Sequence, residues 1–343
     1  MCNNERGRVM ATDTNVVENP VTGERAEPVR TKGRSFFGVA LTLAATAYVG
    51  LSVLIAHLFT NQQANLGIRT IDASPDEVGL PFEDVTFPAE DGLTVSGWLI
   101  PQTGSKTAVV MIPGGANNRL NRIIDPHQSG ESQLKLMRAL WERGHTMLLY
   151  DPRGTGRSEG DRLSYGFLEA GDLLGALRFL DGRGFAARRV GVIGWSMGTT
   201  TALYALARTT YGGLVADSAL GSFSNEDITR YVARVLSLPL VLARAAVPAM
   251  TIGTFMAARL LWGMNLGARA VDELSHNPLP VLVIHGRADS QIEVRSGEEV
   301  ALAAGDKLFA AYYLDGVDHC GAYADNPAWY VDTVCDAFDR MLR

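Results

Sequence analysis

The 343-residue sequence is poor in cysteine and has no excess of basic residues. Its three cysteines, Cys2, Cys320 and Cys335, form no CxxC pair or other metal-ligand spacing, so a zinc site is unsupported. The formal net charge is -6, so the chain lacks the excess of Lys and Arg that is typical of nucleic-acid-binding proteins. We therefore expect no metal, no cofactor and no nucleic-acid partner. Cys320 and Cys335 are expected as buried thiols, with a disulfide as the alternative in an oxidising compartment.

Charged side chains are also missing from one long stretch, because no Asp, Glu, Lys or Arg occurs from Ser35 to Ile68. Within this stretch, Phe36 to Phe59 supplies the roughly 20 apolar residues that a helix needs to cross a bilayer. A cleaved signal peptide and a buried core helix are the alternatives, but the apolar part of a signal peptide is usually about 7 to 15 residues long and is followed by a small-x-small site. We interpret residues 35–60 as an uncleaved transmembrane helix.

The flanks of this helix predict its orientation. Residues 1–34 are polar and lack apolar periodicity, so we expect a disordered tail. Only Arg69 follows the helix closely, whereas the tail ends in a basic cluster made of Arg25, Arg30, Lys32 and Arg34. Because positive flanks stay in the cytoplasm, the tail is predicted to be cytoplasmic and the rest of the chain extracytoplasmic. Residues 61–80 are interpreted as a linker.

From residue 81 to residue 343, short apolar runs alternate with amphipathic helical stretches. The runs FEDVTF and LTVSGWLI, joined at Asp91-Gly92, predict a hairpin. Later runs such as HTMLLYD and PVLVIHG are separated by helices, which indicates parallel strands with right-handed crossovers. The pattern predicts one α/β domain with an eight-stranded, mostly parallel sheet, helices on both faces, and only the first hairpin antiparallel.

About sixty residues separate the runs GGLVADSA and PVLVIHG, far more than an ordinary connection needs. This stretch is apolar, but Pro239, Pro248 and Arg244 interrupt it. A membrane crossing here would also place the last two strands on the other side of the membrane from their sheet. We interpret residues 222–278, approximately, as a helical cap whose apolar surface can touch the bilayer.

A serine stands at the tightest bend of the segment RVGVIGWSMGTT. The residues Gly194-Trp195-Ser196-Met197-Gly198 form a GxSxG sequence between a predicted strand and a predicted helix. The glycines let strand and helix approach closely, and the strained turn lifts the serine hydroxyl above the sheet. The five-residue motif is weak by itself, so it is the strand–turn–helix context that indicates a nucleophile.

Three motifs make the sequence resemble the α/β-hydrolase superfamily: this serine turn, YDPRGTGRSEG at 150–160 and VLVIHGRAD at 281–289. They occur in that family's order, and the resemblance covers nearly everything from residue 82 on. Within the superfamily the chain is most similar to bacterial relatives of membrane-anchored hydrolases that act on acyl esters, thioesters or short peptides. The resemblance implies the α/β-hydrolase fold and a Ser-His-acid triad.

Family order implies Ser196 as nucleophile, Asp289 as acid and His319 as base. A serine hydroxyl is a weak nucleophile at neutral pH, so a base must take its proton and an acid must orient that base. Asp217, which ends the strand after the serine helix, is the alternative acid, because some relatives use that position. Two aspartates that flank His319 suit a turn better.

The resemblance also implies two N–H donors for the oxyanion, those of Met197 and of Gly115. The segment GGA at 114–116 takes the place of the family's HGx motif, and a simple turn is the alternative role for its glycines. Pro113 stands where a histidine is usual, and Pro152 where an aromatic residue often follows the aspartate. The segment ADSQIE also lacks the usual Val-Pro. These departures remove no catalytic group but obscure the substrate.

We therefore expect a membrane-anchored serine hydrolase that forms an acyl-enzyme and cleaves carboxylic esters or thioesters of apolar acyl groups. Its expected partners are a small or lipid-like acyl substrate and the membrane, through the N-terminal helix and the cap. A serine peptidase or aminopeptidase of the same fold is one alternative. A catalytically inactive hydrolase-fold binding protein is the other, since a fold does not fix a function.

Overall fold

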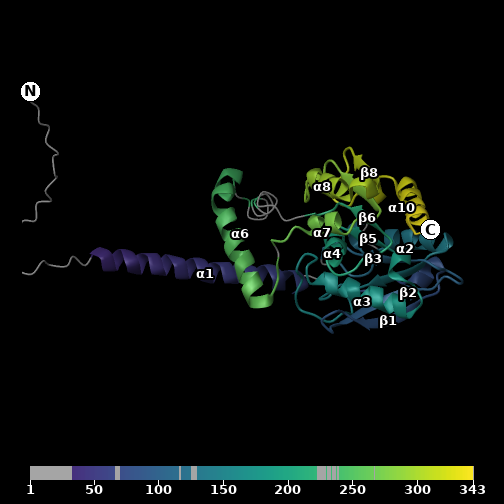
Figure 1. Cartoon of the computed structure of the whole chain (residues 1–343), viewed down its shortest axis with the longest axis horizontal. Helices are drawn as coiled ribbons and strands as arrows, with labels where there is room; N and C mark the ends of the chain where they lie inside the picture. The colour runs from purple at the N-terminus through teal and green to yellow at the C-terminus, as the bar shows by residue number, and fades with distance from the viewer. Residues whose placement is uncertain are drawn as a thin grey trace, which may run out of the picture. The chain divides into compact units, whose positions relative to one another are not determined.

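The computed structural model describes most of the chain (Figure 1): residues 33–65, 70–115, 117–124, 130–221, 229, 233, 237, 239–265 and 267–342. Most of the predicted tail lies outside the described residues, as do Arg69, Ala116 and the greater part of 222–238. The orientation signal from Arg25, Arg30 and Lys32 therefore remains a prediction.

One long helix, α1 (Gly33–Asn65), covers the charge-free stretch and extends five residues beyond its predicted end. Its segment Phe37–His57 is long and apolar enough to cross a membrane, with 21 residues and a mean hydropathy of 2.1. Only 11% of its most apolar window is buried, which distinguishes it from the core helix of a soluble protein. By length and composition, α1 can be a membrane span or a signal anchor.

Eight strands form one sheet in the order β1-β2-β4-β3-β5-β6-β7-β8. The strands are β1 (Glu83–Pro88), β2 (Thr94–Ile100), β3 (Ala108–Ile112), β4 (Thr146–Tyr150), β5 (Val190–Trp195), β6 (Gly213–Asp217), β7 (Val281–Gly286) and β8 (Leu308–Leu314). Every pairing from β4 to β8 is parallel, as predicted. β2 pairs antiparallel with β4 as well as with β1, so the sheet has one antiparallel pairing besides the predicted hairpin.

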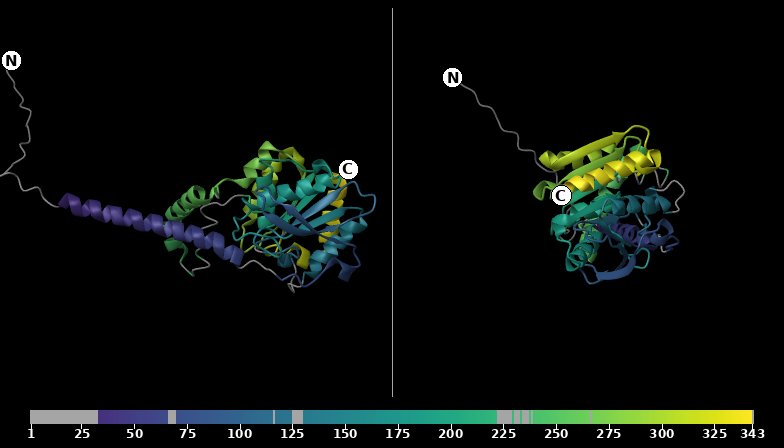
Figure 2. Two further views of the ribbon diagram at one scale, coloured as in Figure 1. Left: turned by 90° about the horizontal axis from the view of Figure 1, so that it is seen from below. Right: turned by 90° about the vertical axis from the view of Figure 1, so that its right-hand side faces the viewer.

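Helices cover both faces of this sheet (Figure 2). Alternate residues of each strand point to opposite faces, so Val110 of β3 joins one core and Met111 the other. The Val110 core includes α3 (Glu169–Gly182), α4 (Met197–Ala205), α7 (Ala270–His276) and α8 (Val294–Ala304). The Met111 core includes α2 (Glu131–Glu142), α9 (Ala322–Asp325) and α10 (Pro327–Met341). Short 3₁₀ turns complete the fold: η1 (Pro75–Val78), η2 (Arg122–Ile124), η3 (Ala187–Arg189) and η4 (Gly305–Lys307).

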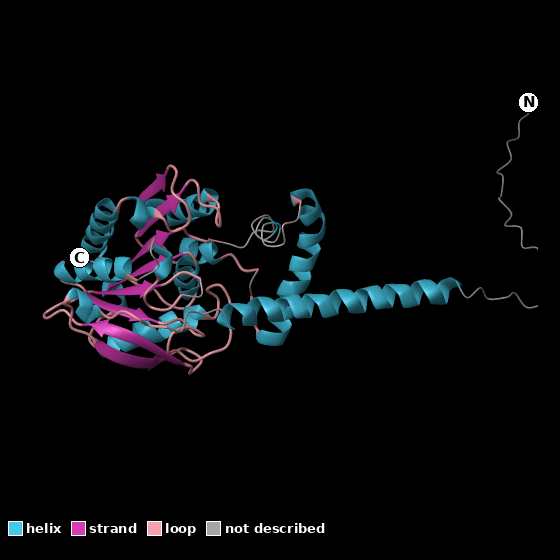
Figure 3. Cartoon of the chain, turned by 180° about the vertical axis from the view of Figure 1, so that it is seen from behind, coloured by secondary structure: helices cyan, strands magenta, loops and turns pink. Residues whose placement is uncertain are grey.

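The predicted cap contains the long helix α6 (Leu240–Trp262), which has Pro248 in its interior and ends at Gly263. This helix lies outside the two helix layers (Figure 3). α7 also falls within the predicted cap range, but it packs in the core with α4 and α8. Cys320 and Cys335 are buried free thiols.

Candidate active site

Ser196 occupies the predicted strained turn between β5 and α4, with φ 51° and ψ −115°. A positive φ is uncommon for a non-glycine residue and marks stored strain. A Cβ at Gly194 would lie 2.5 Å from the backbone of Gly198 and Thr199. A Cβ at Gly198 would lie 2.2 Å from the carbonyl oxygen of Ile112. Both neighbours of the turn therefore have to be glycine.

Asp289 and His319 meet at the carboxyl edge of the sheet, where Asp289 follows β7 and His319 follows β8. His319 Nδ1 lies 2.8 Å from Asp289 Oδ2 and donates to it, because a carboxylate only accepts. Asp289 Oδ1 accepts the backbone N–H groups of Gln291 at 2.9 Å and Ile292 at 2.8 Å. Both side chains are almost fully buried, so the pair is shielded from water.

His285, at the end of β7, is a second partner of the same carboxylate. Its Nε2 lies 3.3 Å from Asp289 Oδ2 and 3.1 Å from the carbonyl oxygen of Ile292. Both atoms are acceptors, so this nitrogen carries the hydrogen. Burial alone would raise the pKa of Asp289, but the hydrogen bonds from His285 and His319 outweigh it and hold that pKa well below its usual range. Asp289 is therefore ionised throughout the neutral range.

The loop that carries His319 is bonded to the strand beside the serine turn. Cys320 N–H donates to Ser218 Oγ at 2.8 Å, and Ser196 N–H donates to the carbonyl oxygen of Asp217 at 2.9 Å. Both acceptors lie at the end of β6, between β5 and β7. Serine and histidine thus come to the same edge, although no hydrogen bond joins Ser196 to His319 in the described part of the chain. Such contacts are often open without substrate.

Asp318 joins the acid loop to the base loop. Its Oδ1 accepts the N–H of Ser290 at 2.7 Å and the N–H of His319 at 2.7 Å. The Ser290 N–H is the main reason that the pKa of Asp318 is lowered. The turn role expected for this residue is therefore a bridge between two loops of the site.

Asp217, the alternative acid, serves a different network. Tyr330 donates its hydroxyl to Asp217 Oδ2 at 2.7 Å, and Trp195 Nε1 donates to the Tyr330 oxygen at 2.9 Å. Burial raises the pKa of Asp217 to about 6. No hydrogen bond between Asp217 and His319 occurs among the described residues, so the structure places the imidazole on Asp289.

The loop after β3 runs beside the serine. A Cβ at Gly114 would lie 3.0 Å from the carbonyl oxygen of Trp195 and 3.3 Å from Ser196 Cβ. The next residue, Gly115, has a φ of 53°, in the region that glycine adopts without strain. Met197 is the first residue of α4, and N–H groups in the first turn of a helix have no acceptor within it. The two expected oxyanion donors thus lie on segments that border Ser196.

Two asparagines, Asn117 and Asn121, hold this loop, and neither is predicted from the sequence. Gly114 N–H donates to Asn121 Oδ1 at 2.9 Å, and Asn117 Nδ2 donates to the Gly114 carbonyl at 2.7 Å. Their only sequence signal is their place in the segment GGANNRLN, and polar residues are common in any loop.

The motif at 150–160 is a structural brace. Asp151 accepts a bidentate pair from Arg119, at 3.0 and 2.6 Å, and both side chains are fully buried. Arg153 donates through Nε and one Nη to Asp172 Oδ1 and through its backbone N–H to Oδ2, and burial raises the pKa of Asp172 to about 6. A Cβ at Gly156 would overlap the Asp151 carboxylate, at 2.1 Å. These buried ion pairs hold the loop in place.

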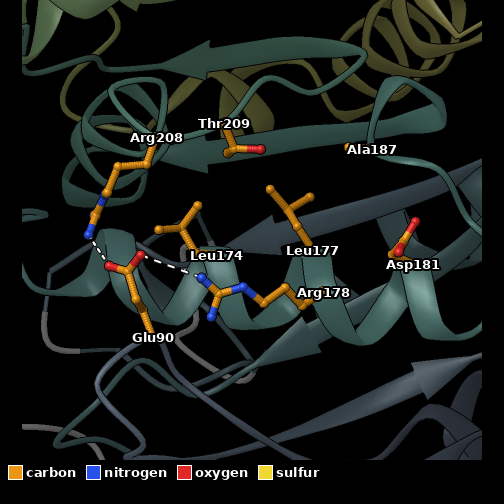
Figure 4. A pocket seen from close by; sticks show the side chains of 8 residues that line it. All are labelled: Glu90, Leu174, Leu177, Arg178, Asp181, Ala187, Arg208 and Thr209. Atoms are coloured by element: carbon orange, nitrogen blue, oxygen red, sulfur yellow. Dashed lines mark hydrogen bonds and ion pairs between the residues drawn. The ribbon is translucent and has the colours of Figure 1, made fainter.

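Two surface cavities have linings that do not include Ser196, Asp289 or His319. One, of about 270 Å³, is lined by Glu90, which forms ion pairs with Arg178 and Arg208 (Figure 4). The other, of about 380 Å³, is lined by residues such as Arg153 and Tyr204. Neither is lined by a triad residue. Among the residues that the structure describes, no three His, Cys, Asp or Glu side chains gather as metal ligands.

Known proteins share this sequence pattern and architecture. A family model described as alpha/beta hydrolase fold matches residues 107–232. The uncharacterized protein YqkD of Bacillus subtilis is 28% identical over 319 residues, covering 88% of this chain and 97% of that protein. The uncharacterized protein YfhR of Escherichia coli K12 is 25% identical over 250 residues, covering 71% of this chain and 75% of that protein.

Solved structures resemble it in fold. The esterase Pf2001 of Pyrococcus furiosus gives a TM-score of 0.63 at 21% identity, covering 81% of this chain and 98% of that one. The alpha/beta hydrolase GrgF of Penicillium sp. sh18 gives 0.56 at 19% identity, covering 77% and 99%. With the strand order and the serine turn described above, these likenesses show that the chain has the α/β-hydrolase fold.

Proposed function

We propose that the protein is a membrane-anchored serine hydrolase that cleaves carboxylic esters or thioesters of apolar acyl groups. The observation that carries this proposal is the His319–Asp289 hydrogen bond of 2.8 Å, at the sheet edge where Ser196 stands in a strained turn. The esterases among the similar structures support ester hydrolysis. α1 would be the anchor, and the basic flank before it favours an extracytoplasmic catalytic domain.

The hydrogen bond between His319 and Asp289 supports the following role for each member of the proposed triad. His319 Nδ1 donates to the ionised Asp289, so the other ring nitrogen, Nε2, is free of its proton in the neutral imidazole. Nε2 takes the Ser196 hydroxyl proton as the serine oxygen attacks the acyl carbonyl carbon. It then returns this proton to the leaving alcohol or thiol as the bond to the acyl group breaks. Water repeats the sequence on the acyl-enzyme and releases the acid.

The oxyanion of the tetrahedral intermediate would accept from the N–H groups of Met197 and Gly115. A donor of this kind lowers the activation barrier by about 3 to 4 kcal/mol in comparable enzymes. The asparagines at 117 and 121 would keep the Gly115 segment in place, so that it does not reorganise during the reaction.

Full-length protein in detergent would be assayed on p-nitrophenyl esters of increasing acyl length and on aminoacyl p-nitroanilides. We expect ester hydrolysis that rises from acetate to longer acyl chains and is abolished by Ser196→Ala. Faster cleavage of the anilides would replace the esterase with a peptidase. Absence of both activities in the parent protein would favour an inactive hydrolase-fold binding protein.

A further inference from the structure

α6 packs against the part of α1 that begins at Tyr48. The Tyr48 hydroxyl donates to the carbonyl oxygen of Ala249 in α6. A Cβ at Gly253 would lie 2.3 Å from Ser52 Oγ, so the two helices approach as closely as glycine allows. Ser52 and Ala56 of α1 are buried in this contact, at 2% and 1% exposure. Close contact through small residues is how helices associate inside membranes.

The depth of this contact follows from its place on α1. Tyr48, Ser52 and Ala56 all fall within Phe37–His57, the segment able to span a membrane. At 1.5 Å per residue, Tyr48 lies about 14 Å before His57, the end of that segment. This is about half of a hydrocarbon core of roughly 30 Å. If α1 spans the bilayer, α6 meets it among the lipid tails and not above the headgroups.

α6 presents an apolar face that the protein does not cover. The α6 apolar stripe consists of Val241, Leu242, Ile252, Met256 and Leu260, which are 56% to 79% exposed. The spacing of four between Ile252, Met256 and Leu260 puts them on one side of the helix. Soluble proteins rarely expose such a contiguous row of large apolar side chains.

The opposite side of α6 faces the rest of the chain. Ala243, Val247, Thr254 and Ala258 are buried, at helical spacing from one another. The only charged residues of α6 are two arginines, at 244 and 259, and the helix has no acidic residue. Arg259, three residues after Met256, lies on the same exposed side of the helix as the stripe, and the long side chain of an arginine can extend its guanidinium to the lipid headgroups.

α6 is also connected to the serine helix. Ala257 and Ala258 of α6 form a cluster with Phe167, whose ring contacts Tyr204 of α4 with a centroid distance of 5.5 Å. A Cβ at Gly166 would lie 2.7 Å from the backbone nitrogen of Thr201, so this segment lies directly on α4. α4 begins at the residue after Ser196. α6 is thus separated from α4, the helix that begins after Ser196, by one layer of side chains.

We propose that α6 is embedded in the same bilayer leaflet as the second half of the α1 span, with its apolar stripe against the lipid tails, and that the substrate is an acyl ester resident in that leaflet. This inference rests on the proposed anchor and, for the substrate, on the proposed ester hydrolysis. A helix that reaches among the lipid tails beside the site brings it to substrates that do not dissolve in water.

Lipid contact is tested without any activity measurement. In a Cys2→Ser background, whose other two cysteines are buried, single cysteines at Met256, Leu260 and Leu302 would carry an NBD label. Leu302 on α8 is the matched control, since it is an 83% exposed leucine on the sheet domain. In phosphatidylcholine vesicles we expect doxyl lipids to quench the labels at 256 and 260, and aqueous iodide to quench only the label at 302.

Three outcomes would overturn the inference. Iodide quenching at 256 and 260 would place the stripe in water. Labels shielded from both quenchers would show that a protein, such as a second copy of the chain, covers it. A label at Leu43 of α1 tests the membrane anchor itself. Lipid quenching at 43 together with iodide quenching at 256 would reject the embedding of α6 but keep the anchor. Iodide quenching at both positions would reject the anchor as well.

The substrate class needs a second assay. The double variant Met256→Glu/Leu260→Glu is compared with Leu302→Glu on soluble p-nitrophenyl acetate and on a long-chain ester embedded in vesicles. We expect the double variant to lose at least about tenfold on the embedded ester and to stay within about twofold on acetate. Equal loss on both substrates would reject the membrane-resident substrate, whereas inactivity of the parent on both would reject the proposed hydrolase.

Discussion

Two aspartates at the ends of neighbouring strands, Asp217 on β6 and Asp289 after β7, are both buried and yet their pKa values are shifted in opposite directions. Asp289 accepts hydrogen from two histidine rings and two backbone N–H groups, and its pKa is held well below the usual range. Asp217 accepts from the Tyr330 hydroxyl, and burial raises its pKa to about 6. The difference lies in the donors around each carboxylate and not in its place on the sheet.

This difference decides which aspartate suits the base. An imidazole that gains a proton during each turnover needs an anion behind it at every working pH. Asp289 meets this condition because its donors keep it ionised. The pKa of Asp217 is about 6. Its carboxylate accepts the Tyr330 hydroxyl, which in turn accepts the indole N–H of Trp195, the residue before Ser196.

The largest expected effect comes from removing the negative charge of Asp289. Asp289→Asn should lower kcat/KM on a p-nitrophenyl ester by about 10³- to 10⁴-fold, because the amide favours the wrong imidazole tautomer. Asp217→Asn is the matched control and should stay within about threefold. A collapse of activity in Asp217→Asn with activity kept in Asp289→Asn would reverse the assignment.

An intermediate effect is expected at Asp318, whose carboxylate accepts the backbone N–H groups of Ser290 and His319. Asp318→Ala removes three hydrogen bonds to a charged acceptor, two from backbone N–H groups and one from the Ser290 hydroxyl, and should lower kcat by about tenfold, with KM within about twofold. Asp318→Asn keeps an acceptor oxygen and should recover part of the loss. A change in KM alone would show that this residue acts on substrate binding instead.

The smallest effect concerns stability and pH. The folded pKa of Asp217, about 6, lies above its ordinary value of 3.8, so the folded state binds more protons than the unfolded state between these values. Stability contributed by this group is therefore present at low pH and falls as pH rises from about 4 to 6. The loss is roughly 1.4 kcal/mol for each pH unit that separates the folded pKa from the unfolded one.

Asp217→Asn should reduce that slope. Between pH 5 and 7 we expect the variant to lose about 1 to 2 kcal/mol less unfolding free energy than the parent, measured by urea denaturation of the full chain in detergent. Asp172, whose pKa is also about 6, contributes equally to both proteins and cancels in the difference. Parallel pH dependences would show that the folded pKa of Asp217 is not raised and would weaken the contrast with Asp289.

The sheet could be predicted from the sequence nearly strand by strand. Buried parallel strands are continuous apolar runs between turn residues, so PVLVIHG locates β7 to within one residue. α7 shows where such patterns fail: only Ala270, Val271 and Leu274 of its seven residues are buried, too few to separate a core helix from a cap helix.

The candidate site was only partly predictable. Motif order led to Asp289 and His319, and the structure brings them together. The second histidine on Asp289 and the asparagines that hold the Gly114 loop were missed, because their partners lie across turns whose geometry leaves no periodic pattern in the sequence. Loop polar residues become interpretable only when the loop's own hydrogen bonds are known.

Ser196 as the nucleophile is tested most directly by peptide mapping of the full chain after reaction with a fluorophosphonate. Mass spectrometry should find one phosphonyl adduct on the peptide that contains Ser196, with no adduct in Ser196→Ala and slower labelling in His319→Ala. An unmodified parent protein, or an adduct on another residue that persists in Ser196→Ala, would contradict a Ser196–His319–Asp289 hydrolase.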